Sequence, residues 1–186
     1  MDSVYIQKVL NGSTEEFRYL IRKYKDMAFS VAVSVVKNEF EAEEVVQEAF
    51  IKAYKNLASF KEKSNFKTWF YRILINEAFK CLSKKRKEII LPTNQNLPEV
   101  EDIEDTFRGM NIEEQKFLVS ESLKKIPAKE SLILQLFYFD ENSIDEITNL
   151  TGWSEGNVKV ILYRARKHLL EVVKTMAENE LIIRKS

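Results

Sequence analysis

Glycine and proline are scarce in this sequence. Its 186 residues include four glycines and three prolines. Many-turned β proteins use these residues at their turns, so the scarcity disfavours a β fold and favours helices joined by short turns. With 45% hydrophobic residues, the chain can bury one sizeable core or two small ones. We therefore predict an all-α protein.

Cysteine and histidine occur once each, as Cys81 and His168. A single cysteine excludes an internal disulfide and is typical of a reducing cytoplasm. The sequence also has no cluster of cysteine and histidine that resembles a zinc site and no glycine-rich phosphate loop. His168 stands beside Arg166 and Lys167 on a basic helix, which indicates a surface ring and not a catalytic one. We expect a protein that is not an enzyme and that needs no cofactor and no metal.

Long hydrophobic runs are also missing. No segment approaches the ~18 apolar residues of a membrane span, and the start of the chain, Met1 to Val4, lacks a basic region followed by an apolar run. We therefore expect a cytoplasmic protein with no direct membrane insertion.

The chain carries no net charge, because 29 basic residues balance 29 acidic ones. Tight non-specific DNA binding by the protein alone is therefore not expected, since that affinity rests on positive charge. The distribution is uneven, however. Basic residues gather in 61–87 and 159–174, and an acidic block occupies 99–114 between them. This pattern indicates two basic surfaces separated by an acidic tether.

Helical periodicity divides the chain into two groups of segments. Ser13 and Glu16 have the spacing of a capping box before the first segment. The predicted helices are 17–35, about 41–57 and 66–86, then 113–125, 128–138, 143–150 and 154–178. We predict two small helical domains, 1–90 and 113–186, joined by a flexible acidic linker at 91–112.

The segment from Phe60 to Lys87 combines aromatic and basic residues. Flat aromatic faces can stack on unpaired bases while cations meet phosphates, which is how proteins bind single-stranded nucleic acid. Laid out as a helix, one stripe carries Thr68, Trp69, Arg72, Asn76, Lys80 and Ser83. An alternative is that Trp69 simply covers the edge of the core.

The helix near 41–57 has an unusual outer face. Glu44, Gln47 and Glu48 surround Ile51, an apolar residue on an otherwise charged surface. This arrangement suits the docking of a partner helix. A single exposed isoleucine can also have no role.

The end of the chain has the pattern of a helix-turn-helix motif. A capping box at Ser143 opens a short helix, residues 151–153 form a turn, and Ser154 caps a longer basic helix. The residues predicted to face outward are Gly156, Lys159, Val160, Tyr163, Arg164 and Lys167, and Asn157 could pair with adenine. The same geometry occurs in helical bundles that never bind DNA.

Three segments together resemble the bacterial sigma-70 family, in its extracytoplasmic function (ECF) branch. They are 41–50 (EAEEVVQEAF), 66–73 (FKTWFYRI) with Asn76, and 154–159 (SEGNVK) with 163–166 (YRAR). The resemblance runs from about Phe17 to Leu170, with the motifs in the family's order. Asn157, Val160 and Ile161 depart from the Thr, Ser and Arg that are common in the family, so the upstream DNA sequence does not carry over.

The resemblance implies a role for each candidate surface. Region 2, at 1–90, binds core RNA polymerase at the β′ clamp helices through Glu44, Gln47, Glu48 and Ile51. The minus-ten element is met by Phe60, Lys61, Lys63, Asn65, Lys67, Trp69, Arg72, Asn76 and Lys80. Region 4 reads the minus-thirty-five element through Ser154, Gly156, Asn157, Lys159, Val160, Tyr163, Arg164 and Lys167. The implied partners are the β′ clamp helices and β flap of core polymerase, promoter DNA and an anti-sigma factor.

Two other functions compete with this reading. A stand-alone helix-turn-helix regulator would bind duplex DNA tightly by itself and would leave the Trp69 segment unexplained. A helical adaptor with protein partners alone would tolerate loss of the basic residues.

Overall fold

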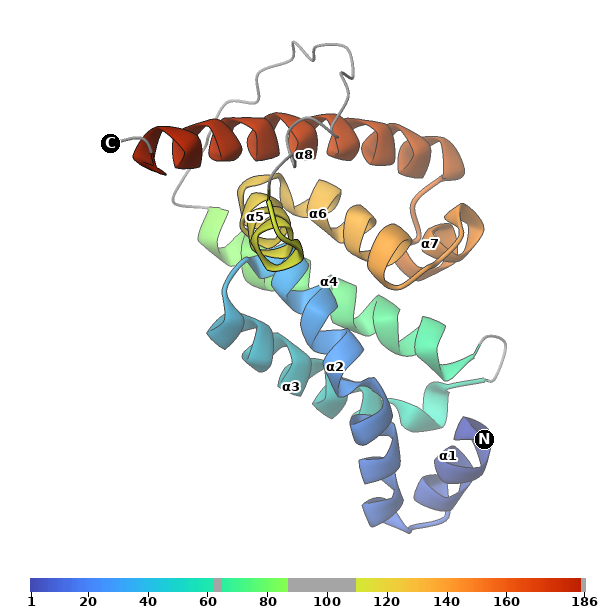
Figure 1. The fold of residues 1–186 in the computed structure, drawn as a ribbon. Helices are drawn as coiled ribbons and strands as arrows, with labels where there is room; N and C mark the ends of the chain where they lie inside the picture. The colour runs from blue at the N-terminus through green and yellow to red at the C-terminus, as the bar shows by residue number, and fades with distance from the viewer. Residues whose placement is uncertain (62–64, 87–109, 185–186) are drawn as a thin grey trace.

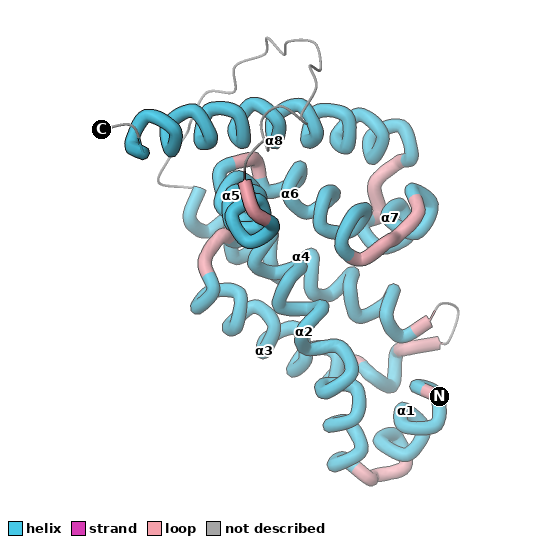
Figure 2. Tube along the Cα trace, viewed as in Figure 1, coloured by secondary structure: helices cyan, strands magenta, loops and turns pink. Residues whose placement is uncertain are grey.

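The computed structural model describes residues 1–61, 65–86 and 110–184, with the backbone alone at 85–86 and 179–184. Within these ranges the secondary structure is helical, with turns and no strand (Figure 2). The predicted all-α fold is confirmed. The predicted linker lies outside the described residues up to position 109, and its last residue, Ile112, begins a helix.

The first half of the chain forms a bundle. Its helices are α1 (Asp2–Leu10), α2 (Phe17–Val36), α3 (Glu39–Lys55) and α4 (Phe66–Arg86), with short 3-10 turns η1 (Thr14–Glu16) and η2 (Leu57–Ser59). Helices α2, α3 and α4 pack against one another around aromatic residues. The rings of Phe50 and Phe70 stack with centroids 4.4 Å apart, and Phe66 stacks on Phe70 at 5.9 Å.

The second half is built against one long helix. Its elements are α5 (Ile112–Lys125), α6 (Ala128–Leu134), the π-helical turn η3 (Gln135–Phe139), α7 (Ile144–Thr151) and α8 (Glu155–Arg184). Helices α5, α6 and α7 all contact α8, which runs along one side of the molecule (Figure 1). Buried Val158, Leu162 and Ala165 give α8 its apolar stripe.

The helix ends follow local capping chemistry in most places. Ser143 forms the predicted capping box with Glu146, and Gly152 ends α7 with φ 74°, a left-handed conformation that glycine adopts without strain. The capping box expected at Ser13 is wrong. Ser13 instead precedes the 3-10 turn without a side-chain cap, and Glu16 pairs with Lys8 at 3.0 Å.

Two features of the fold were not predicted from the sequence. Helix α1 was not predicted, and its N-terminus has no side-chain cap that could have marked it. The α5 helix begins with a capping box between Asn111 and Glu114, although Asn111 was expected at the end of the linker. Both elements lie at the margins of the recognised motifs.

The two halves pack on each other. Helix α2 contacts α6 and η3, and α4 contacts α7, so one cluster of buried side chains continues from the first half into the second. Figure 1 shows α2 and α4 directly below the layer formed by α5, α6 and α7. We call this packing of α2 on α6 and η3, and of α4 on α7, the closed arrangement. It decides which of the candidate surfaces are accessible.

Candidate nucleic-acid and polymerase interfaces

The α4 helix separates a buried wall from an exposed stripe, as its sequence predicts. Phe70, Tyr71 and Leu74 have no exposed surface. Arg72 and Asn76 are exposed on the other side. The helix therefore presents polar side chains while aromatic residues anchor it in the core.

Trp69 lies between these two environments. Its side chain is partly buried, and its ring centroid lies 5.3 Å from that of Phe60 and 5.7 Å from that of Phe66. The ring therefore covers the edge of the core and still reaches the surface. The interpretation that Trp69 covers the edge of the core is confirmed, and contact of the ring with unpaired bases stays a prediction.

Asn65 has a structural task that the sequence analysis missed. Its Oδ1 atom accepts hydrogen bonds from the backbone N–H and from the hydroxyl of Thr68, both at 2.8 Å. An asparagine in this position caps the first turn of the helix. The cap leaves the amide nitrogen as the polar group that a base could meet. We call the segment between η2 and the first turn of α4 the junction. Lys61 is exposed there, and Lys63 lies outside the described residues.

Two of the predicted DNA-binding cations contact the second half of the chain. Arg72 donates a hydrogen bond from Nε to the backbone carbonyl of Asn149 at 2.7 Å. The ammonium group of Lys67 lies 3.5 Å from Oδ1 of Asn142. These residues are 75 or more positions apart, so no local sequence signal could have revealed the contacts. In the closed arrangement, part of the predicted minus-ten surface faces the helix-turn-helix.

A partly buried polar pair, Tyr71 and Asp140, lies next to these contacts. The Tyr71 hydroxyl donates to Oδ2 of Asp140 at 3.4 Å, and Gln135 donates to Oδ1 of Asp140 at 3.1 Å. Burial raises the pKa of Asp140, although the hydrogen bond from Gln135 opposes this effect. Burial and the neighbouring carboxylate raise the pKa of Tyr71. The hydroxyl therefore stays protonated and available as a donor.

A second polar link joins the halves at the end of α2. Lys37 adopts a left-handed backbone conformation with φ 62°, and its Nζ atom donates a hydrogen bond to the carbonyl of Leu123 at 2.6 Å. Leu123 belongs to the last turn of α5, whose carbonyl groups lack helical partners. Burial lowers the pKa of Lys37 to about 7.

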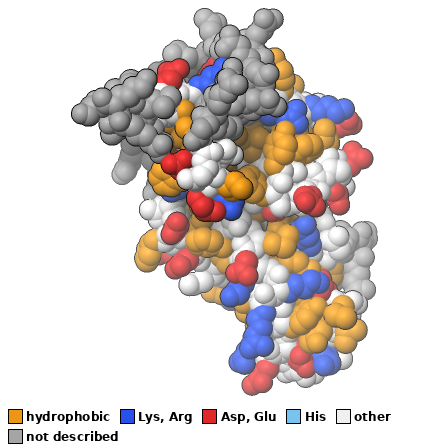
Figure 3. Space-filling model, in the orientation of Figure 1, with side chains coloured by type: hydrophobic (Ala, Val, Ile, Leu, Met, Phe, Trp, Pro, Cys, Tyr) orange, Lys and Arg blue, Asp and Glu red, His pale blue; other side chains and the backbone are white. Residues whose placement is uncertain are grey.

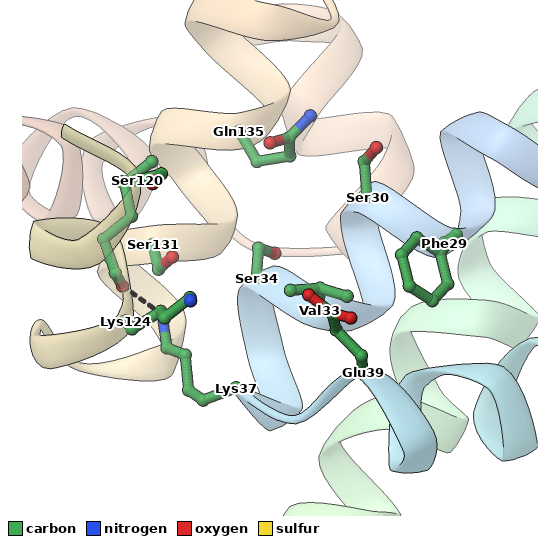
Figure 4. Close-up of a pocket in the computed structure, with 11 residues that line it drawn as sticks. Phe29, Ser30, Val33, Ser34, Lys37, Glu39, Ser120, Lys124, Ser131 and Gln135 are labelled. Atoms are coloured by element: carbon green, nitrogen blue, oxygen red, sulfur yellow. Dashed lines mark hydrogen bonds between the residues drawn. The ribbon is translucent and has the colours of Figure 1, made fainter. Parts of the chain in front are cut away.

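Lys37 lies at the edge of a cleft of about 320 Å³ between the halves (Figure 4). Phe29, Val33 and Leu123 supply its apolar lining, and the hydroxyls of Ser34 and Ser131 lie on opposite sides. The carboxylate of Glu39 and the ammonium of Lys124 also border it. The halves are thus incompletely packed at this end of their contact.

The predicted protein-docking residues gather in one groove. A cleft of about 450 Å³ between α3 and α4 is lined by Glu44, Val45, Gln47, Glu48, Ile51, Glu77, Lys80, Cys81 and Lys84. All four residues predicted to bind polymerase are among them. Ile51 is 47% exposed, so its side chain is available to a partner. Lys52 pairs with Glu77 at 2.5 Å and with Glu48 at 3.6 Å, which ties the two helices together beside the groove.

Lys80 belongs to this groove and not to the junction around Trp69. Its ammonium group lies 3.9 Å from Glu77, and its side chain lines the cleft together with Ile51. Its assignment to minus-ten DNA therefore has less geometric support than that of Trp69 or Asn65.

The start of α8 presents the surface that the helix-turn-helix pattern predicts. Six of the eight candidate residues lie within α8 and are exposed: Gly156, Asn157, Lys159, Val160, Tyr163 and Arg164. Ser154 caps the helix through a 3.4 Å contact from the backbone N–H of Asn157. Lys159 pairs with Glu155 at 2.5 Å, and this hydrogen bond raises the pKa of Lys159.

Two expectations for α8 are wrong. Lys167 was expected to face outward but is 8% exposed, and its ammonium group lies 5.0 Å from the centre of the Tyr163 ring. The aliphatic stem of a lysine can be covered when its charge meets an aromatic face. His168 was expected at the surface, but it is partly buried and its Nδ1 lies 2.5 Å from Oε2 of Glu130. The pair holds α8 against α6.

The described parts of the chain contain neither of two further features, a cluster of metal ligands or a membrane-spanning helix. There, no group of three or more histidine, cysteine, aspartate or glutamate side chains is placed to hold a metal ion. Among the same residues, no helix is long and apolar enough to cross a membrane. On the face shown in Figure 3, acidic and basic side chains are interspersed, in keeping with the balanced charge.

Comparison with known proteins matches both halves of the chain. Sigma-70 region 2 matches residues 20–88, and Sigma-70 region 4 matches residues 116–169. The ECF RNA polymerase sigma factor SigW of Bacillus subtilis is 29% identical over 88% of this chain and 92% of its own length. RNA polymerase sigma factor SigV of the same organism is 30% identical over 79% of this chain and 84% of its own.

Solved structures show the same fold. CnrH, determined in complex with the cytosolic domain of CnrY, aligns with a TM-score of 0.63 and 19% identity over 92% of this chain and 96% of its own. The sigma factor RpoE of Bartonella quintana, in complex with the anti-sigma factor NepR, aligns with a TM-score of 0.64 and 21% identity over 86% and 98%.

The matches place a polymerase-binding region before a helix-turn-helix region, which a stand-alone DNA-binding regulator does not need. The groove between α3 and α4, the aromatic start of α4 and the exposed face of α8 fall within these two regions. The chain therefore belongs to the sigma-70 family, as an ECF sigma factor that binds core RNA polymerase and promoter DNA to direct transcription initiation.

Proposed function

We propose specific surfaces for each step of initiation by this sigma factor. The single observation that carries the proposal is the arrangement of exposed Ile51 in a groove that contains Glu44, Gln47 and Glu48. An exposed apolar side chain with a charged rim is typical of a site where another helix docks. We assign this groove to the β′ clamp helices of core polymerase, and region 4 to the β flap.

The minus-ten element is assigned to the junction before α4. Trp69 and Phe60 offer aromatic faces there, Asn65 offers an amide, and Lys61 and Lys67 offer positive charge. An unstacked base needs an aromatic surface and a polar edge, and its phosphates need cations. The minus-thirty-five element is assigned to the exposed start of α8, where Lys159, Val160 and Arg164 face away from the core.

The closed arrangement makes these assignments conditional on a conformational change. Arg72 and Lys67 contact the second half of the chain, so full exposure of the minus-ten surface requires α4 and α7 to separate. Polymerase would supply the energy for this separation by binding each region at its own site. An anti-sigma factor, as NepR is for RpoE of Bartonella quintana, would act against it.

The protein has no catalytic task of its own in this proposal. Polymerase performs nucleotide addition, and the sigma factor contributes binding and strand separation. We place this work in the cytoplasm, and we place the domain boundaries at 1–90 and 113–186.

In vitro transcription tests the proposal directly. The purified full chain is mixed with bacterial core polymerase and a library of promoter fragments, and transcript ends are sequenced. We expect transcripts that start downstream of one shared pair of elements. Core polymerase that is not bound by the chain, or transcripts that do not depend on promoter sequence, would contradict the proposal.

A further inference from the structure

Helix α1 precedes the segment that matches region 2 and has no function assigned so far. It packs through Ile6, 1% exposed, and Val9, 8% exposed, and it contacts both α2 and η2. Outside the core, the Tyr5 ring stacks on that of Tyr19 with centroids 3.7 Å apart. The helix is therefore fixed on the bundle by apolar and aromatic contacts.

The first residue of α1 is the centre of a charged network. The Asp2 carboxylate accepts a hydrogen bond from Lys23 at 2.5 Å and another from the hydroxyl of Tyr24. Burial opposes ionisation of Asp2, but the two hydrogen bonds outweigh it and lower its pKa. Burial and the bond to Asp2 raise the pKa of Tyr24 to about 12. At neutral pH, Asp2 is thus ionised and Tyr24 is a donor.

Tyr24 carries this network to the start of α4. Its side chain is 5% exposed, and its ring centroid lies 5.5 Å from that of Phe66. Phe66 is the first residue of α4 and directly follows the capping residue Asn65. Hydrogen bonding and ring packing thus connect Asp2 to the junction assigned to minus-ten DNA.

The same elements face each other across a cleft of about 290 Å³. Asp2, Ser3 and Ile6 line it from α1, Lys23 lines it from α2, and Phe60, Asn65 and Phe66 line the opposite side. Figure 1 shows α1 beneath the start of α4. The position of α1 therefore sets the width of the space next to the minus-ten residues.

We propose that Asp2 is a positioning residue for promoter opening, which acts through Tyr24 to hold Phe66 and Asn65 where they meet unstacked promoter DNA. This inference rests on the proposed minus-ten function. It adds an element outside the matched region to the strand-opening machinery, and it assigns to α1 a role in opening that is separable from binding to polymerase.

The test compares Asp2→Asn and Tyr24→Phe in the complete holoenzyme. Asp2→Asn keeps the shape of the side chain and removes its charge, whereas Tyr24→Phe keeps the ring against Phe66 and removes the hydroxyl. We expect each to reduce promoter opening, measured by the fluorescence of 2-aminopurine in the minus-ten strand, by roughly fivefold to tenfold. Core affinity, measured separately, should stay unchanged. Asp26→Asn, at an exposed aspartate on α2, is the matched control and should open promoters like the wild type.

Two further readouts separate positioning from general stability. In a Trp153→Phe background, Trp69 reports on its contacts with Phe60 and Phe66, so its emission should shift in Asp2→Asn. Asp2→Asn combined with Asn65→Ala should open promoters about as well as Asn65→Ala alone, because both act on one junction.

Wild-type opening in both variants would overturn the inference, and so would additive effects with Asn65→Ala. Equal losses of opening and core binding, with a lower melting temperature, would show a structural role and overturn it as well. A wild-type holoenzyme that assembles but opens no promoter would instead contradict the proposed minus-ten function, and the inference would fall with it.

Discussion

Arg72 on the exposed stripe of α4 donates a 2.7 Å hydrogen bond to the backbone carbonyl of Asn149 in α7. One of the two residues belongs to the predicted minus-ten surface, and the other belongs to the first helix of the helix-turn-helix motif. In the closed arrangement this carbonyl occupies the Nε donor of Arg72, so that donor is not available to a DNA phosphate. We therefore expect closure of the molecule to compete with DNA binding at Arg72.

Arg72→Ala is expected to loosen the closed arrangement. Loss of one charge-assisted hydrogen bond at an exposed site should shift the closed-to-open ratio by roughly threefold. Energy transfer between dyes at Lys25→Cys and Thr175→Cys, in a Cys81→Ser background, measures this ratio. Asn76→Ala is the matched control, because Asn76 is exposed on the same stripe. Equal distances in both variants would show that the bond contributes nothing to closure.

The closed arrangement is expected to weaken as the pH falls from about 9 to about 7. Burial holds the pKa of Lys37 near 7, compared with 10.5 for a free lysine, so opening takes up a proton in this range. Closure is therefore fully stable above the free pKa and loses stability until the pH reaches the buried value. Between pH 9 and pH 7 the closed arrangement should lose about 2 kcal/mol of stability.

Lys37→Met tests this expectation with the same pair of dyes. The variant keeps an apolar stem and removes the titrating group, so the pH dependence should disappear. Lys129→Met, at an exposed lysine of α6, is the control, because Lys25 is already replaced to carry a dye. This variant should keep the wild-type change of the closed-to-open ratio with pH. If the closed-to-open ratio of Lys37→Met still changes with pH as in the wild type, the pH dependence belongs to another group.

Trp69→Ala is expected to impair promoter opening more than core binding. Its ring is partly buried against Phe60 and Phe66, so the free energy of unfolding should also fall by about 1–2 kcal/mol. Opening is measured by permanganate reactivity and core binding by titration with labelled polymerase. Trp69→Phe should retain much of the promoter opening and much of the free energy of unfolding. Equal losses of opening and core binding would show that Trp69 serves the core alone.

Ile51→Ala is expected to weaken binding to core polymerase about tenfold with little change in stability, because 47% of its surface is exposed in the groove. Ile21→Ala on α2, where the side chain is 36% exposed, is the control. Binding curves against labelled core polymerase and thermal melts measure the two effects. Identical core affinity of the two variants would argue against the groove as the docking site.

Lys159→Ala and Arg164→Ala are expected to weaken binding to the upstream element, since both side chains are exposed on α8. If the removed side chain hydrogen-bonds to a base edge, the substitution should cost about 1–3 kcal/mol of binding free energy and relax specificity at one position. Lys167→Ala should have a smaller effect because its side chain is covered. Holoenzyme binding to a panel of upstream sequences decides between base and phosphate contacts, because a uniform loss across the panel would indicate phosphate contacts.

Local sequence was enough to define most of the helices and most of their buried faces. The run without glycine or proline from Phe66 to Arg86 set the bounds of α4, and Ser143 and Gly152 marked both ends of α7, because propensity and capping are local properties. Periodicity also separated buried Leu74 and Val158 from the exposed faces. The groove residues on α3 were found for the same reason, since they share one face of a single helix.

Which exposed residues remain free depends on tertiary packing and could not be read from the sequence. Arg72 meets Asn149, Lys37 meets Leu123, and Tyr71 meets Asp140 across 69 or more positions, where no periodic pattern reaches. The covered position of Lys167 and the pairing of His168 with Glu130 likewise depend on neighbours distant in sequence or on side-chain packing. Desolvation and pairing arise when separate elements meet. Most of the helices therefore follow from the sequence, while the expected competition between closure and DNA binding follows from how the helices pack.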